Sequence, residues 1–287
     1  MAIRSYDSTP LLHAAKHTVD SYVESGMVIA LGSGRASGFA IQYLGQKIVS
    51  GALKDIVGVP TSISSASEAA KAGVPLDQYR DSSKIDLAFD DADVIEEETL
   101  AAVIGRQKMQ GGESILEQKT ILEAARKLVL IVTGKQYRGG VDGSIPVMIK
   151  AINWMDIAEE IDDLFLGDAE VWRRSSIGLV DPLGGDFPLI TKEGHNVLDV
   201  IFTSPILNLG NVPASFRANF FPSFILESEF CCGTIDILSA DVADSLDQID
   251  GVVEHGVIAR IPCTVVIASE DGLLTVDNTL GLEGSKI

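Results

Sequence analysis

Short apolar runs alternate with amphipathic segments over the first 150 residues. The runs at 27–31, 56–59, 85–89, 128–132 and 146–149 are typical of strands that are covered on both faces. Apolar residues at three- and four-residue steps predict helices over 8–25, 39–50 and 113–127, and a short helix that ends at Gly73. This alternation predicts a parallel, doubly wound sheet.

The pattern changes after residue 150. A helix is predicted over 152–165 and another over 240–249, with strands at 171–180, 187–190, 197–202 and 251–258. A last apolar run at 264–268 predicts a further strand of the first sheet. We therefore expect an α/β fold, with a doubly wound, mostly parallel sheet formed by residues 1–150 and about 260–287. A smaller α+β (ferredoxin-like) domain, about 151–259, is set into it.

A glycine-containing turn links the first strand to the second helix. Its sequence is Gly32-Ser33-Gly34-Arg35-Ala36-Ser37-Gly38. A strand, a glycine turn and a helix direct backbone N–H groups and the helix dipole toward an anion. Because Ser37 stands where a dinucleotide fingerprint has glycine, the turn favours a small anion such as phosphate over a dinucleotide.

Acidic residues follow the apolar run at 85–89. Asp90, Asp91 and Asp93 come first, and Lys108 and Glu117 lie further along the chain. Ligands of α/β sheets bind at the carboxyl ends of the strands, where these carboxylates would lie. Carboxylates beside a lysine suit proton transfer on a small anionic substrate.

Composition narrows the partners of the protein. The chain has 287 residues and a net charge of −19, which argues against nucleic acid or an anionic membrane as a partner. No apolar run has the length of a membrane span, and residues 1–10 resemble no targeting segment. Three cysteines, with no C-x-x-C among them, and four unclustered histidines predict reduced thiols and no metal site.

Six segments together resemble type A ribose-5-phosphate isomerase over nearly the whole chain. They are Val28–Ala36, Val59–Leu76, Ile85–Asp93, Thr133–Val147, Thr191–Val200 and Ile249–Gly256. The resemblance implies an isomerase of the non-oxidative pentose phosphate pathway. It would interconvert D-ribose 5-phosphate and D-ribulose 5-phosphate through a cis-enediolate, without cofactor. It also implies a homo-oligomer, such as a homodimer, and a cytoplasmic or plastid-stroma (chloroplast) location.

The resemblance also implies roles for individual residues. Glu117 would move the proton between C1 and C2, and Lys108 would supply a cation to the substrate oxygens or phosphate. Asp90 and Asp93 would contact the sugar hydroxyls. The remaining substrate-binding residues would be Ser33, Gly34, Arg35, Ala36, Asp91 and Lys135.

This chain departs from the family pattern at the same edge. Arg35-Ala36 replaces a hydroxyl pair, and Asp91 stands where the family has glycine. Two registers are open downstream. Anchoring on Lys108 puts Glu117 at the position of the base. Anchoring on Gly111-Gly112 and Lys119 puts Gln118 there instead, and glutamine is no base at neutral pH.

Three hypotheses follow from these observations. The first is the isomerase. The second is a non-catalytic relative that binds a sugar phosphate or serves as a structural subunit of an assembly. The third is another enzyme of the wider superfamily, such as a CoA transferase or an aminosugar-phosphate deaminase, for which the sequence offers no clear catalytic glutamate or histidine. An assay with ribose 5-phosphate separates the first two.

Overall fold

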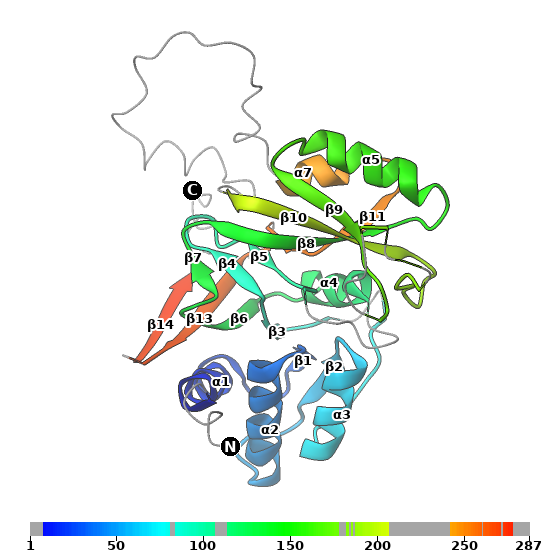
Figure 1. Cartoon of the computed structure of the whole chain (residues 1–287). Coiled ribbons are helices and arrows are strands. Elements are labelled where there is room, and N and C mark those ends of the chain that lie inside the picture. Colours follow the sequence, from blue (N-terminus) through cyan, green and yellow to red (C-terminus); the bar gives the residue numbers. More distant parts are fainter. Residues whose placement is uncertain are drawn as a thin grey trace, which may run out of the picture.

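The described residues form three sheets, a large sheet covered by helices and two four-stranded sheets, one of which lies above the large sheet in Figure 1. The computed structural model describes residues 8–80, 84–106, 114–177, 182–183, 185, 187–206, 242–259, 261–270 and 272–277. Its helices are α1 (Ser8–Tyr22), α2 (Arg35–Val49), α3 (Ile63–Ala72), α4 (Ile115–Glu123), α5 (Trp154–Leu164) and α7 (Val242–Asp247).

The large sheet has six strands in the order β14-β13-β6-β3-β1-β2. All of its pairings are parallel except that of β13 with β14 at one edge. The mostly parallel α/β sheet expected from the sequence is confirmed. Its strands are β1 (Val28–Leu31), β2 (Val57–Pro60), β3 (Leu87–Asp91), β6 (Leu128–Thr133), β13 (Cys263–Ser269) and β14 (Gly272–Asp277).

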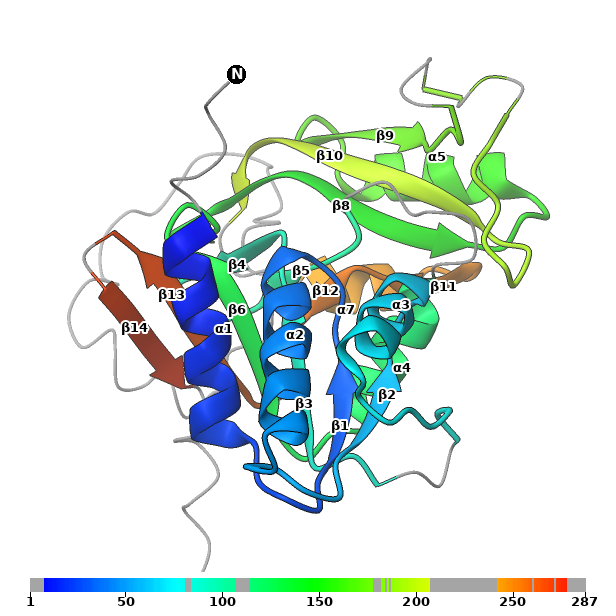
Figure 2. The ribbon, with the colours of Figure 1, turned by 90° about the horizontal axis from the view of Figure 1, so that it is seen from below.

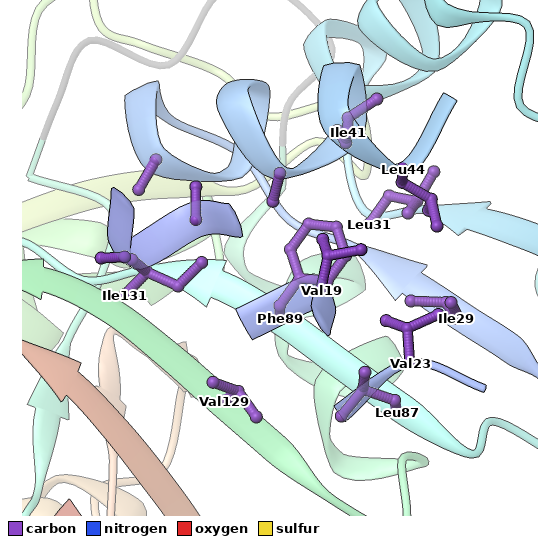
Figure 3. Close-up of a cluster of buried hydrophobic side chains, with 14 of the residues drawn as sticks. Val19, Val23, Ile29, Leu31, Ile41, Leu44, Leu87, Phe89, Val129 and Ile131 are labelled. Carbon is purple, nitrogen blue, oxygen red and sulfur yellow. The ribbon is translucent and has the colours of Figure 1, made fainter. Parts of the chain in front are cut away.

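Alternate residues of the central strands pack on opposite faces of this sheet, as the two-residue repeat of a strand requires. On one face, Leu31, Phe89 and Ile131 pack against α1 and α2, and Figure 3 shows their side chains in one cluster with Val19 and Ile41. Helices α1, α2 and α3 lie side by side on that face (Figure 2).

Helix α4 packs on the other face of the sheet. Its Ile121 and Leu122 share a buried cluster with Ala88 of β3 and Leu130 of β6. A smaller sheet, in the order β12-β5-β4-β7, contributes to the same cluster through Ile95. Its strands are β4 (Val94–Glu96), β5 (Ala102–Val103), β7 (Tyr137–Arg138) and β12 (Val257–Ile258).

The described elements of the second domain follow the βαββαβ order of a ferredoxin-like fold. Strands β8 (Val141–Ile149), β9 (Ala169–Arg173), β10 (Asn196–Ile206) and β11 (Val252–His255) pair antiparallel in the order β11-β8-β10-β9. Helices α5 and α7 pack on this sheet through Ile161 and Leu246. Strand β8 lies in this sheet, so the sheet begins before the domain boundary that the sequence predicts at residue 150.

Several predicted elements differ in detail from those observed. The strand expected over 251–258 is two strands, β11 and β12, in different sheets. A β-carbon on Gly256 between them would lie 2.3 Å from the carbonyl oxygen of Ile104, so the chain turns there against another backbone. The strand expected over 187–190 consists of isolated bridges at Pro188 and Ile190. Strands β4, β5, β7 and β14 were not predicted.

Candidate functional site

The carboxyl ends of β1 and β3 meet closely because the residue after β1 is glycine. The Gly32 amide donates to the Phe89 carbonyl oxygen at 2.9 Å. A β-carbon on Gly32 would lie 2.3 Å from Asp90 Oδ1 and 2.5 Å from Asp90 Cα. Glycine thus allows the turn after β1 to lie directly against Asp90.

Asp90 is the buried centre of the site, with 0% of its surface exposed. Its Oδ1 accepts hydrogen bonds from the backbone amide of Ser33 at 2.7 Å and from the backbone amide of Asp91 at 2.9 Å. Its Oδ2 accepts from Gln118 Nε2 at 2.7 Å. Burial, helped by the charge of Asp91 and opposed by these hydrogen bonds, raises the pKa of Asp90 to about 7. Asp90 therefore exchanges a proton near neutral pH.

This raised pKa has a consequence for stability. A carboxyl that binds its proton more tightly when folded contributes stability below its unfolded pKa of about 3.8. That contribution is lost as the pH rises through about 7. We expect Asp90→Asn to raise the free energy of unfolding at pH 8 by about 2 kcal/mol, because each unit of pKa shift corresponds to about 1.4 kcal/mol and the new amide keeps some of the hydrogen bonds.

Urea denaturation of both proteins at pH 8 and at pH 4.5 measures this effect. The difference between them should shrink at pH 4.5, where Asp90 is protonated in the folded protein. A loss of stability in Asp90→Asn that is equal at both pH values would show that the buried charge has no such cost.

Asp91 binds the first turn of α2. Its Oδ2 accepts from the amide of Ala36 at 2.9 Å, and its Oδ1 accepts from the amide and the hydroxyl of Ser37, each at 2.7 Å. Gly34 permits this approach, since a β-carbon there would lie 2.4 Å from Asp91 Cγ. Burial raises the pKa of Asp91, and its hydrogen bonds from α2 oppose that rise. The helix N-terminus that the sequence assigns to a phosphate thus holds a carboxylate of the chain itself.

Asp93 is held toward the second domain. Its Oδ2 accepts from the amide of Arg106 at 2.8 Å. The Arg106 guanidinium continues to the carbonyl oxygens of Ser144 at 2.6 Å and Asp142 at 2.7 Å, in β8. Arg106, which the sequence did not single out, therefore connects an acidic residue of the site to the second sheet.

Helix α4 directs Glu117 and Gln118 in different directions. Glu117 is exposed and forms an ion pair with Lys192 from the β9–β10 connection. Gln118 lies inward on Asp90, and the next residue, Lys119, is buried and donates to Glu254 Oε1 at 2.6 Å. These contacts fit the register that anchors on Lys119, with Gln118 beside the acidic residues.

The structure brings together part of the predicted set. Ser33, Ala36, Asp90, Asp91 and the glutamine meet at the ends of β1 and β3. Ser33 also donates through its hydroxyl to Ser62, the residue that caps α3, at 2.6 Å.

Two of the predicted cations, Arg35 and Lys135, are exposed. Arg35 is exposed, with its guanidinium 6.0 Å from the centre of the Phe39 ring. Lys135 is exposed in the turn after β6. Lys108, with Gly111-Gly112, lies outside the described residues.

Other candidate chemistry is limited in the part of the chain that the structure describes. No group of three or more histidine, cysteine, aspartate or glutamate side chains there could hold a metal ion. Cys263 is a buried thiol, and burial raises its pKa to about 12, while Cys231 and Cys232 lie outside the described residues. Among the described helices, none is long and apolar enough to cross a membrane.

Comparison with known proteins identifies the relatives of this chain. The family model described as ribose 5-phosphate isomerase A (phosphoriboisomerase A) matches residues 57–218. A protein of Gluconobacter oxydans named ribose-5-phosphate isomerase A is 29% identical over 262 residues, which cover 91% of this chain and 93% of that protein.

Solved structures share the fold. The ribose 5-phosphate isomerase from Plasmodium falciparum has a TM-score of 0.71 at 24% identity, covering 95% of this chain and 99% of that one. A D-ribose-5-phosphate isomerase in complex with phospho-erythronic acid has a TM-score of 0.72 at 24% identity, covering 96% of this chain and 100% of its own. Because the family model spans more than half of the chain, this protein belongs to the ribose 5-phosphate isomerase A family.

Proposed function

We propose that this protein interconverts D-ribose 5-phosphate and D-ribulose 5-phosphate, the reaction for which its family is named. The relatives named ribose-5-phosphate isomerase, over nearly the full length of the chain, support this proposal. A solved relative that binds phospho-erythronic acid supports a sugar phosphate as the ligand. Self-association, and a cytoplasmic or plastid-stroma location, stay predictions.

The reaction moves a proton between C1 and C2 of the sugar, so it needs a base near the substrate and hydrogen-bond donors where the enediolate oxygens become negative. A base works best when its pKa is near the working pH. The observation that carries this proposal is the buried carboxylate of Asp90 at the end of β3, which contacts Ser33 and Gln118 and whose pKa burial raises to about 7. In its carboxylate form it takes the proton from one carbon and returns it to the next.

Gln118 has the donor role in this arrangement. Its side-chain amide donates to Asp90 in the absence of substrate. Turning that amide from Asp90 toward a substrate oxygen would uncover the carboxylate and supply a donor to the enediolate in one movement. Glu117, the base expected from one register of the sequence, pairs with Lys192 at the surface in this structure and would need to leave that ion pair to act.

The test is an assay of ribose 5-phosphate turnover by the purified chain and by Asp90→Asn, in which the absorbance of the ketose product is recorded. We expect measurable turnover that rises with pH through about 7, because the carboxylate form is the active one. Asp90→Asn should lose about 100-fold in kcat, the lower end of what a general base contributes. Unchanged turnover in that variant would remove Asp90 from the mechanism.

A second candidate function, a non-catalytic relative, is favoured by two specific observations. The side-chain amide of Gln118 lies beside Asp90, at the position that one of the two registers gives to the base. The carboxylate of Asp91 accepts hydrogen bonds from the N-terminus of α2. Absence of turnover in the unmodified chain, together with binding of ribose 5-phosphate in a calorimeter, would support this candidate and reject the first.

A further inference from the structure

The N-terminus of α2 binds a carboxylate of the chain itself. Three donors of its first turn, the amides of Ala36 and Ser37 and the Ser37 hydroxyl, all reach one carboxylate, that of Asp91. A helix N-terminus attracts negative charge because its first N–H groups have no partner within the helix. Asp91 satisfies donors that a substrate phosphate would otherwise bind.

The backbone on both sides is formed around this contact. Asp91 is the last residue of β3, and its backbone pairs with Ile131 of β6. On the other side, Gly34 has a φ of 125°, a conformation that favours glycine, and its missing side chain leaves the space that Asp91 fills. Because sheet and turn fix both partners, forming the contact orders little further chain, which favours it over binding of a free anion.

The charges nearby strengthen this preference. A phosphate that replaced Asp91 at the helix would lie close to the displaced carboxylate and to Asp90, the neighbouring residue in the chain, whose pKa burial raises to about 7. Like charges at such short range repel in a partly buried site. Arg35, the cation of the same turn, is exposed and rests on Phe39, so it does not neutralise Asp91 in this structure.

We propose that Asp91 is a specificity-determining residue of this site: its carboxylate occupies the anion position at the N-terminus of α2 and lowers the affinity for the phosphate end of a sugar phosphate. A phosphate binds there only when Asp91 moves away from Ala36 and Ser37. The proposal rests on the proposed function only in taking this turn as the phosphate end of the substrate site.

The experiment measures binding of inorganic phosphate and of ribose 5-phosphate by calorimetry, for the unmodified chain, Asp91→Gly and Asp91→Asn. The control is Asp163→Asn, which makes the same change of charge on the exposed surface of α5. We expect Asp91→Gly to bind phosphate at least about tenfold more tightly than the unmodified chain, equivalent to about 1.4 kcal/mol. Asp163→Asn should stay within about twofold of the unmodified chain, since an exposed single charge acts weakly.

A second readout locates the binding. The backbone amide signals of Ala36 and Ser37 should shift on addition of phosphate to Asp91→Gly and stay unchanged in the unmodified chain at the same concentration. If Asp91→Gly does not fold, Asp91→Asn carries the test in the same direction, because it loses the charge and keeps an acceptor for α2.

Two results would overturn the proposal. One is equal phosphate affinity in the unmodified chain and both Asp91 variants. The other is tighter binding without a change at Ala36 and Ser37. Neither readout requires turnover, so an inactive chain whose Asp91→Gly variant gains phosphate affinity would reject the proposed isomerase and still support this role of Asp91.

Discussion

Replacing Gln118 by glutamate should raise turnover of ribose 5-phosphate by about 100-fold or more in a chain without a working base, the second candidate function above, because that is the contribution typical of a positioned general base. Gln118 lies on the inner face of α4, with its amide 2.7 Å from Asp90. A glutamate of the same length would put a second carboxyl at that point. Two carboxyls so close share one proton. The pKa of one carboxyl is raised, and the other carboxyl stays ionised and able to act as a base.

A coupled assay of ribulose 5-phosphate formation measures this gain. The matched variant is Glu117→Gln, which makes the reverse exchange one residue away, on the exposed face of the same helix. We expect Glu117→Gln to change kcat little, because it removes only the surface ion pair with Lys192. Loss of turnover in Glu117→Gln, with no gain in Gln118→Glu, would assign the base to Glu117.

Much of the fold follows from the sequence because buried strands and amphipathic helices repeat with different periods. The apolar runs predicted at 27–31, 85–89 and 128–132 contain central strands of the large sheet. Strand β14 was missed because Leu273 and Leu274, partly exposed on an edge strand, form no clear alternation. The Asp271-Gly272 pair was the available signal, since such a dipeptide between two strands favours a hairpin.

The direction of the Gln118 side chain could also have been predicted from the sequence. Residues at positions i, i+3, i+4 and i+7 share one face of a helix. Starting from Ile115, that face comprises Gln118, Lys119 and Leu122, and its two apolar members are fully covered. The apolar stripe therefore turns Gln118 inward and leaves Glu117 outside, whereas spacing from Lys108 alone left both registers open.

The contact between Asp91 and α2 could not be predicted from the sequence. Asp91 and Ser37 are 54 residues apart and meet only because β1 and β3 pair in register, with Leu31 beside Phe89. Local sequence gives the acidic residues and the glycine turn separately. Whether a carboxylate faces a ligand or the turn itself depends on sub-ångström backbone placement, which no local pattern encodes.

Gly32→Ala should destabilise the protein by about 3 kcal/mol or more, at the upper end of the cost of overpacking. The added methyl group would lie 2.3 Å from the Phe89 carbonyl oxygen as well as from Asp90 Oδ1. The Phe89 carbonyl accepts from the Gly32 amide, so neither backbone segment can withdraw without loss of that hydrogen bond. Phe89 is itself fully buried between the sheet and α2, so displacing it also disturbs the core in Figure 3.

The matched control for this prediction is Gly38→Ala, six residues along the same turn and helix. A β-carbon there would meet no heavy atom within 4 Å, and residue 38 lies within α2. Alanine in a helix is favoured over glycine by about 0.5–1 kcal/mol, so Gly38→Ala should be slightly more stable than the unmodified chain.

Urea denaturation measures the stability of both variants. Equal midpoints for Gly32→Ala and Gly38→Ala would mean that the ends of β1 and β3 separate at little cost. Asp90 could then not be held in the dry environment that gives it a pKa near neutrality, and its role as the base would lose its physical ground.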